Sequence, residues 1–196
     1  MISAEDINGL FKNQLEKIRD EELRGKVIDT WVLGCKLGNW ERVEDLLNMP
    51  YTLLVPTEGI NFIEHTIAVT EGAVALARVQ EDNYSHLPYA IDYDRLYAGG
   101  LLHDVGKLME IESDGRGGYR KSLAGMHLRH PISGAVIAAE CGVAEDILNI
   151  IACHSKEGDG RPQEVETVFV HQADFATFNP LRMKSNNMLI SEIPEV

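Results

Sequence analysis

Two adjacent ionisable residues stand in an apolar stretch of this sequence. His103 and Asp104 follow two leucines in GGLLHDVGKL, where unpaired polar side chains are costly to bury. Neutral imidazole and ionised carboxylate are both ligands for divalent metals, so a bound cation would remove that cost. Lys107 comes three residues after Asp104 and projects on the same side of a helix. Together these residues predict a metal site beside a cation that can hold an anionic substrate.

Other histidines and one further aspartate are candidates for the same site. Those in apolar helical surroundings are His65, His130, His154 and Asp174, with His127 as an alternative to His130. His171 shares the helix face of Asp174 and is expected to orient that carboxylate or to bind substrate. Glu64 and Glu157 are candidate proton donors to a leaving group.

The elements that must position these residues are helical almost throughout. Apolar residues recur at three- and four-residue steps, the period of an amphipathic helix. The predicted helices cover residues 7–18, 27–37, 40–47, 62–79, 95–111, 131–141, 143–153 and 165–178. Residues 51–60 are expected to be an extended connector, and the basic, glycine-rich segment 112–121 a loop. Strands are hard to place, so the sequence predicts an all-α fold.

The composition is that of one globular domain. Of the 196 residues, 44% are hydrophobic and 25% are charged. A net charge of -13 opposes binding to a long nucleic acid or to an anionic membrane. No apolar run is long enough to span a bilayer, and the acidic N-terminus lacks the pattern of a signal peptide. Three cysteines without CxxC spacing suit a reducing compartment, so we expect a cytoplasmic protein.

The ordered motifs resemble the HD-domain superfamily of metal-dependent phosphohydrolases, with the six-ligand dinuclear pattern of its HDIG type. The matching segments are NFIEHTIAV, LLHDVGK, RHPISGA, IIACHSKEG and VHQADFAT. The resemblance covers residues 61–178 and implies a helical bundle of HD-domain type. Residues 1–60 would then form an N-terminal helical extension packed on this domain, and residues 179–196 a C-terminal arm.

The resemblance also implies two divalent metal ions per chain, drawn from Mn, Fe, Co, Ni or Zn. One ion would be bound by His65, His103, Asp104 and Asp174. The other would be bound by His130 and His154, with Asp104 bridging both. A hydroxide bridging the metals would attack phosphorus, and Lys107 would stabilise a non-bridging oxygen. Asp104 and Lys107 are therefore the expected catalytic residues, and Lys107 and His171 the expected substrate-binding residues.

Three functions stay open for this ligand set. The resemblance implies first a phosphomonoesterase or phosphodiesterase that acts on a small nucleotide-like or other phosphorylated metabolite. An HD-type di-iron oxygenase uses the same ligands, and a signal-binding module could retain them without activity. Cys153 before His154, and Arg161-Pro162 in place of Tyr-Pro, separate the chain from the cyclic-dinucleotide branch of the superfamily.

Residues 1–60 have three open roles. They either cap the bundle, or close the active site with residues 51–59 as a substrate-facing loop. Alternatively, their amphipathic faces, which carry Trp31 and Trp40, form the surface of a homodimer. The sequence does not choose among these roles.

Overall fold

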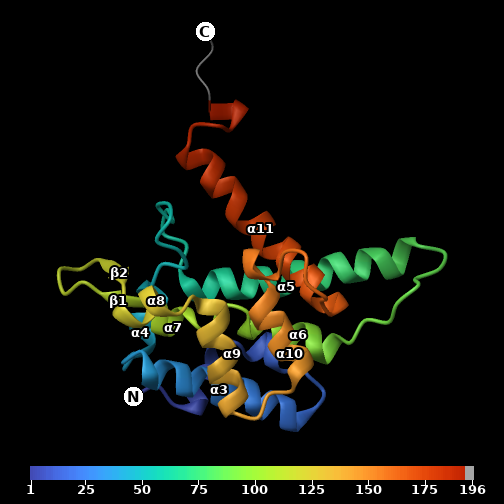
Figure 1. Ribbon diagram of the computed structural model, residues 1–196, viewed down its shortest axis with the longest axis horizontal. Helices are drawn as coiled ribbons and strands as arrows, with labels where there is room; N and C mark the ends of the chain where they lie inside the picture. Colours follow the sequence, from blue (N-terminus) through green and yellow to red (C-terminus); the bar gives the residue numbers. More distant parts are fainter. Residues whose placement is uncertain (193–196) are drawn as a thin grey trace.

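Two long helices organise the computed structural model, which describes residues 1–192. Helix α5, Phe62–Asn83, packs along helix α11, Val165–Ser185, more extensively than any other pair of described helices. Helix α6, Tyr93–Leu102, packs against α5, and helix α10, Glu145–Cys153, packs against α6 and against α9, His130–Glu140. Figure 1 shows α5 crossing the molecule and the C-terminal part of α11 rising away from it.

The residues before α5 add further helices to this core. These are α1 (Ala4–Leu10), α2 (Lys12–Leu15), α3 (Glu21–Leu37) and α4 (Val43–Asn48). Trp31 of α3 is fully buried, with ring centroids 4.8 Å from Phe11 and 5.3 Å from Phe62. Burial of a side chain of this size stabilises the fold by about 2–3 kcal/mol. The N-terminal residues therefore share one hydrophobic core with the helices that follow.

A reciprocal cap fixes where α5 begins. The side-chain oxygen of Asn61 accepts a hydrogen bond from the backbone nitrogen of Glu64 at 2.9 Å. The Glu64 carboxylate in turn accepts one from the backbone nitrogen of Asn61 at 3.0 Å. Such a cap satisfies two N–H groups that lack helical partners. It holds His65 in the first turn of α5 and occupies Glu64, which the sequence suggested as a proton donor.

The predicted helix 95–111 is wrong in its second half. Helix α6 ends at Leu102, four residues of turn follow, and the short helix α7 covers Lys107–Glu110. The imidazole Nδ1 of His103 donates to the carbonyl oxygen of Gly100 at 2.6 Å. In a continuing helix, the carbonyl oxygen of Gly100 would instead accept a hydrogen bond from the backbone nitrogen four residues later.

Gly106 lets the same turn lie against the start of α9. A Cβ atom at this position would lie 2.1 Å from the carbonyl oxygen of His130 and 2.5 Å from the backbone nitrogen of Gly134. Only a residue without a side chain permits this approach. The glycine therefore brings the turn that carries Asp104 next to His130.

The segment 112–121 is more than a loop. Its ends belong to two antiparallel strands, β1 (Ile111–Ser113) and β2 (Tyr119–Lys121), and two glycines with positive φ lie in the turn between them. The short helix α8, Leu123–His127, follows. Since these are the only strands among the described residues, the all-α fold class is confirmed. None of the described helices combines the length and the apolarity that a bilayer crossing needs.

Helix α11 continues past its predicted end at residue 178. It runs to Ser185 with Pro180 inside it. Proline removes one backbone hydrogen bond, and the residue four positions earlier, Ala176, is exposed, so water can bond its freed carbonyl. The expected arm 179–196 is therefore helical in its first part, and its last four residues lie outside the described part of the chain.

Candidate metal centre

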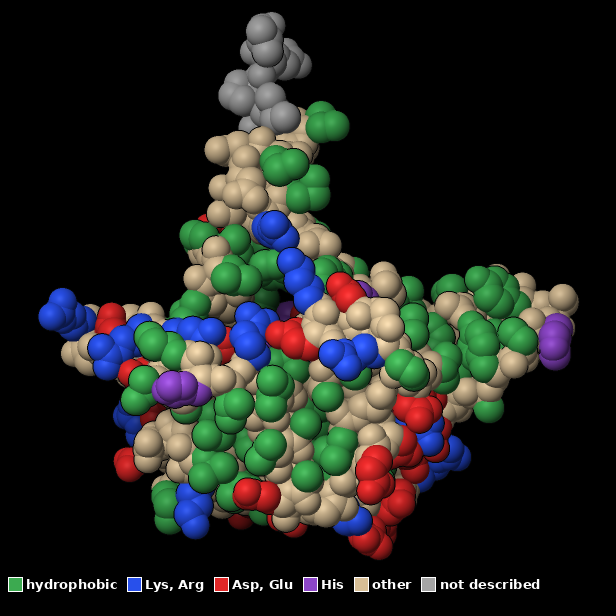
Figure 2. All heavy atoms as spheres, viewed as in Figure 1, with side chains coloured by type: hydrophobic (Ala, Val, Ile, Leu, Met, Phe, Trp, Pro, Cys, Tyr) green, Lys and Arg blue, Asp and Glu red, His purple; other side chains and the backbone are tan. Residues whose placement is uncertain are grey.

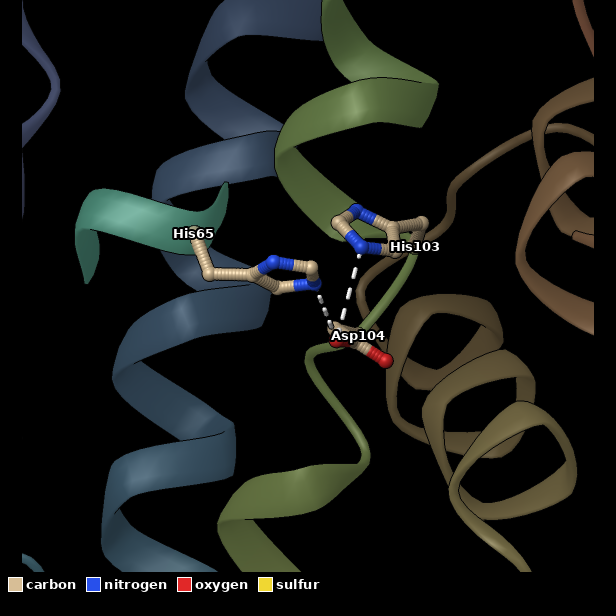
Figure 3. Close-up of side chains that lie close together, drawn as sticks. All are labelled: His65, His103 and Asp104. Atoms are coloured by element: carbon tan, nitrogen blue, oxygen red, sulfur yellow. Dashed lines mark ion pairs between the residues drawn. The ribbon is translucent and has the colours of Figure 1, made fainter. Parts of the chain in front are cut away.

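Five parts of the chain bring a cluster of histidines and carboxylates together. The contributions are His65 of α5, His103 and Asp104 of the turn after α6, His130 of α9, His154 at the end of α10, and Asp174 of α11. All of these side chains except that of Asp174 are buried. Figure 3 shows the rings of His65 and His103 directed toward Asp104. The six residues that the sequence proposed as metal ligands thus lie in one cluster.

Asp104 lies at the middle of the cluster, and its two carboxylate oxygens face different histidines. Oδ2 lies 3.4 Å from Nε2 of His65 and 3.4 Å from Nε2 of His103. Oδ1 lies 3.3 Å from Nε2 of His130 and 3.5 Å from Nε2 of His154. The carboxylate therefore belongs to two groups of potential metal ligands, one at each oxygen.

Backbone carbonyls set the orientation of two of these imidazoles. His103 Nδ1 contacts the carbonyl oxygen of Gly100 at 2.6 Å, and His154 Nδ1 contacts that of Ile151 at 2.8 Å. A carbonyl can only accept a hydrogen bond, so each Nδ1 carries the proton. The lone pair of each ring then lies on Nε2, which is the atom directed at Asp104.

A carboxylate orients His130 in the same way. Glu110 Oε2 accepts from the His130 ring Nδ1 and from the His130 backbone nitrogen, both at 2.8 Å. Burial opposes ionisation of Glu110, but these interactions with His130 outweigh it and lower the pKa of Glu110 to about 2. Burial also lowers the pKa of His130, against the effect of Glu110. The neutral imidazole is therefore favoured, which is the form that binds a metal.

Asp174 joins the cluster through His65. Its Oδ1 lies 3.2 Å from His65 Nε2, the nitrogen that also faces Asp104. Burial opposes ionisation of Asp174, the contact with His65 favours it, and the net effect lowers the pKa of Asp174. The pKa of Asp104 is also lowered, because the charge of Lys107 and the contacts with His103 and His154 outweigh its burial. Both carboxyl groups are ionised at neutral pH, as metal binding requires.

Several buried atoms of the cluster have no hydrogen-bond partner among the described residues. They are Nε2 of His65, His103 and His154 and Oδ1 of Asp104. Unpaired buried polar atoms destabilise a fold unless a ligand satisfies them. Two ligand atoms bound to one ion at about 2.1 Å lie about 3.0–3.4 Å apart, close to the spacings described above. This set of imidazole and carboxylate donors fits divalent transition metals.

Lys107 reaches the cluster from the side of an adjoining cavity. Its ammonium donates to Asp104 Oδ2, the oxygen that faces His65 and His103. The Lys107 side chain is 13% exposed, and its Nζ lies 5.8 Å from the ring centroid of Tyr51. Lys107 lines the cavity together with His130 and Asp174 of the cluster, so its charge is offered to a ligand that enters there.

The cavity has a volume of about 330 Å³ and a mixed lining. Its apolar wall includes Leu53 and Leu54 before α5 and Phe175 and Phe178 of α11. Its basic side chains among the described residues are Lys107, Lys121, Arg129, Lys156 and Arg182. Figure 2 shows Lys and Arg side chains gathered near the base of the protruding part of α11. In a chain with a net charge of -13, this lining suits an anionic ligand with an apolar portion.

Two other histidine candidates lie apart from Asp104. His171 donates through Nδ1 to the carbonyl oxygen of His154 at 2.8 Å, stacks on Phe175, and is not among the residues that line the cavity. His127 is exposed at the end of α8 and has none of the contacts with Asp104 that His130 has.

The structure also places the candidate proton donor Glu157 and the basic residues at the end of the glycine-rich segment 112–121. Burial would raise the pKa of Glu157, but hydrogen bonds and the charge of Arg129 outweigh burial and lower it. An ionised Glu157 cannot give a proton to a leaving group at neutral pH. In the hairpin, Lys121 lines the cavity, whereas Arg120 is exposed.

Sequence reasoning missed several residues around the cluster. They are Glu110, Arg129, Lys156, Phe175, Phe178 and Arg182. Arg129 and Lys156 carry a usable signal, because each lies within two residues of a histidine candidate. Arg182 carries none, since it follows a proline that was expected to lie beyond the helix.

Comparison with known protein families identifies the domain that carries this site. The model of the HD domain matches residues 62–176, which is more than half of the chain. The chain belongs to the HD-domain family. The resemblance to this family that the ordered motifs predicted is confirmed.

Relatives of this HD-domain protein include ribonuclease Y of Pseudothermotoga lettingae, which is 32% identical over 116 residues, or 59% of this chain and 18% of that protein. Ribonuclease Y of Borreliella burgdorferi is 39% identical over 74 residues, or 38% of this chain and 12% of that protein. The chain thus spans less than a fifth of the length of these relatives.

A second kind of relative matches over a longer stretch. Dihydroneopterin 2',3'-cyclic phosphate phosphodiesterase of Methanocaldococcus jannaschii is 28% identical over 172 residues, or 82% of this chain and 65% of that protein. No solved structure matches the chain.

Proposed function

We propose that this HD-domain protein is a phosphodiesterase or phosphomonoesterase that acts on a small phosphorylated metabolite with two divalent metal ions. The observation that carries the proposal is the position of Asp104, whose two oxygens each face a separate pair of histidines. Such an arrangement suits two ions joined by one carboxylate. The phosphodiesterase of Methanocaldococcus jannaschii, similar over 82% of this chain, supports a phosphoester substrate.

Each ion has its own set of proposed ligands. One is assigned to His65, His103, Asp104 and Asp174. The second is assigned to His130, His154 and Asp104. Mn, Fe, Co, Ni and Zn all accept such nitrogen and oxygen donors. When bound, the metals would supply Lewis acidity, which neutralises charge on a phosphoryl group and acidifies water.

The surrounding side chains have positioning and binding roles in this proposal. Glu110 holds the His130 ring with Nε2 toward Asp104. Lys107 donates to a phosphoryl oxygen of the substrate, and its contact with Asp104 and its place in the cavity lining support this role. For His171, the contact with the carbonyl oxygen of His154 supports a role in positioning that histidine, whereas its place outside the cavity lining gives no support to substrate contact.

The cavity supports a small substrate with an organic portion. A volume of about 330 Å³ is at the lower end of the range for small-molecule sites. The phenylalanines of α11 offer apolar surface to a ring system such as a nucleobase. Lys156 and Arg182 offer charge to a second anionic group. A nucleotide-like phosphoester meets both conditions, whereas the net charge of -13 opposes a long nucleic acid.

The oxygenase alternative depends on the same ligands, and no specific observation favours it.

Association into a homodimer stays a prediction, which sedimentation at several protein concentrations would test.

The first experiment measures hydrolysis of bis(4-nitrophenyl) phosphate, 4-nitrophenyl phosphate and a panel of linear and cyclic nucleotides. The protein is loaded with Mn²⁺ or Fe²⁺ without oxygen. His103→Ala combined with Asp104→Ala removes the centre, and His86→Ala, an exposed histidine on a loop, is the matched control. Hydrolysis by the wild type and His86→Ala but not by the double variant supports the proposal. Absence of hydrolysis, with oxygen uptake by the iron-loaded protein, contradicts it.

A further inference from the structure

A buried hydroxyl group without a partner lies beside the proposed metal centre. It belongs to Tyr51, which precedes the part of the chain that the HD domain matches. Tyr51 is 2% exposed, and its hydroxyl oxygen has no hydrogen-bond partner among the described residues. The residue lines the same cavity as Lys107, and the charges of Asp174 and Asp104 act on its hydroxyl. The hydroxyl therefore lies where the cavity meets the cluster.

Packing holds the Tyr51 ring in place on several sides. It stacks on His65 with ring centroids 4.1 Å apart and an interplanar angle of 15°. The Phe178 ring is perpendicular to it, with centroids 6.5 Å apart and an interplanar angle of 88°. The preceding residue, Pro50, pairs with Asn61 in an isolated β-bridge, which closes the connector at the base of α5. The direction of the hydroxyl is thus set before a ligand binds.

The hydroxyl itself has no role in this packing. Phenylalanine would make the same ring contacts without placing an unpaired polar group in a buried position, which is unfavourable. A ligand that supplies an acceptor would remove this cost. Lys107 and the proposed ions attract an anion to the same end of the cavity, so a phosphoryl oxygen is the acceptor that these charges bring there.

We propose that the Tyr51 hydroxyl donates a hydrogen bond to an oxygen of the phosphoryl group bound at the metal centre, beside the ammonium of Lys107. The inference rests on the proposed function and adds a catalytic residue from outside the matched HD domain. Of the three roles that the sequence leaves open for residues 1–60, it favours closure of the active site.

The test compares Tyr51→Phe with the wild type, both loaded with Mn²⁺, and uses Tyr97→Phe as the matched control. Tyr97 is also buried, but the charges that act on its hydroxyl are those of Glu71 and Arg78. Binding of inorganic phosphate is measured by calorimetry, Mn²⁺ affinity by titration, and stability by thermal unfolding. These readouts do not depend on turnover.

We expect Tyr51→Phe to weaken phosphate binding by about 10-fold or more, as loss of a hydrogen bond to a charged acceptor does. Mn²⁺ affinity stays the same, and the midpoint of thermal unfolding does not fall. Tyr97→Phe binds phosphate like the wild type. This pattern separates a hydroxyl that contacts the ligand from one that only supports the fold.

Two results would overturn the inference. In the first, Tyr51→Phe and the wild type bind phosphate equally. In the second, Tyr51→Phe loses Mn²⁺ affinity to the same degree as phosphate affinity, so that the hydroxyl serves the metal centre alone. A different result, in which the Mn²⁺-loaded wild type binds no phosphate and hydrolyses no ester, contradicts the proposed function and the role of Tyr51 with it.

Discussion

The indole nitrogen of Trp31 donates a hydrogen bond of 3.0 Å to the carbonyl oxygen of Leu101, two residues before His103. Helix α6 ends one residue after Leu101, so this carbonyl lacks a helical partner. On the other side of the turn, Trp40 Nε1 donates at 2.8 Å to the carbonyl oxygen of Leu108. Two tryptophans of the N-terminal residues thus hold both ends of the turn that carries the central carboxylate.

Trp31→Phe should destabilise the fold by about 1–3 kcal/mol, because it leaves the buried Leu101 carbonyl unpaired. Urea unfolding followed by circular dichroism measures this change. Trp40→Phe removes the corresponding bond to Leu108 and should act in the same direction. An unchanged unfolding midpoint in both variants would show that these bonds do not support the turn.

His130→Ala combined with His154→Ala should lower the number of Mn²⁺ ions bound per chain from two to one. The remaining ligands, at the other oxygen of Asp104, are not altered by these changes. Equilibrium dialysis with elemental analysis measures the stoichiometry, and the far-ultraviolet spectrum checks that the helices remain. Equal stoichiometry in the wild type and the double variant would contradict the assignment of a second ion to this pair.

Lys107→Met should lower kcat/KM for a phosphoester by about 100-fold, since it removes a positive donor near the phosphoryl group. The metal content should stay the same. Lys36→Met, which changes an exposed lysine of α3, is the matched control. If Lys107→Met turns over substrate as fast as the control, the proposed contact with the phosphoryl group is wrong.

Gly106→Ala should destabilise the fold by about 3 kcal/mol or more, because the new Cβ would lie 2.1 Å from the His130 carbonyl oxygen. Gly25→Ala tests the opposite case. No atom lies within 4 Å of a Cβ at this helical position. Its substitution should stabilise the protein by about 0.5–1 kcal/mol. Thermal unfolding of both variants measures the contrast, and equal midpoints would argue against close contact between the turn and α9.

Glu110→Gln should change how stability depends on pH. In the folded protein the pKa of Glu110 is lowered to about 2 from 4.5, so its ionised form stabilises the fold above pH 4.5 and this contribution is lost toward pH 2. The variant should therefore be less stable than the wild type at pH 6, by about 1–3 kcal/mol, and the difference should shrink as the pH falls. Unfolding with a chelator present measures it. A difference that stays constant from pH 6 to pH 2.5 would exclude this linkage.

Some parts of the site could be predicted because their signals are local. His65 and Asp174 each place a polar group in an apolar helix, and the reciprocal cap at Asn61 is readable from residues three apart. The break at His103 could not be predicted in this way. Apolar residues continue at helical spacing through Val105 and Leu108, and the break depends on contact with α9, which no local pattern encodes.

The cavity was harder to predict because its walls are distant in the sequence. Leu54 and Phe178 line the same space, yet they belong to the connector before α5 and to the last long helix. Tyr51 lies in the connector that would face the substrate in only one of the three roles left open for residues 1–60. Its stacking on His65 depends on how residues 1–60 pack on the domain, and this packing is a tertiary property.

Helix α11 carries Asp174, whose Oδ1 lies 3.2 Å from His65 of α5, and Arg182, which follows Pro180 in the same helix. The HD domain match ends at residue 176, between these two residues. A substitution at Arg182 therefore alters the charge offered to a ligand while the carboxylate two turns earlier keeps its place. In evolutionary terms, the proposed function would leave one continuous helix with a position that can diverge with the substrate and another that the reaction constrains.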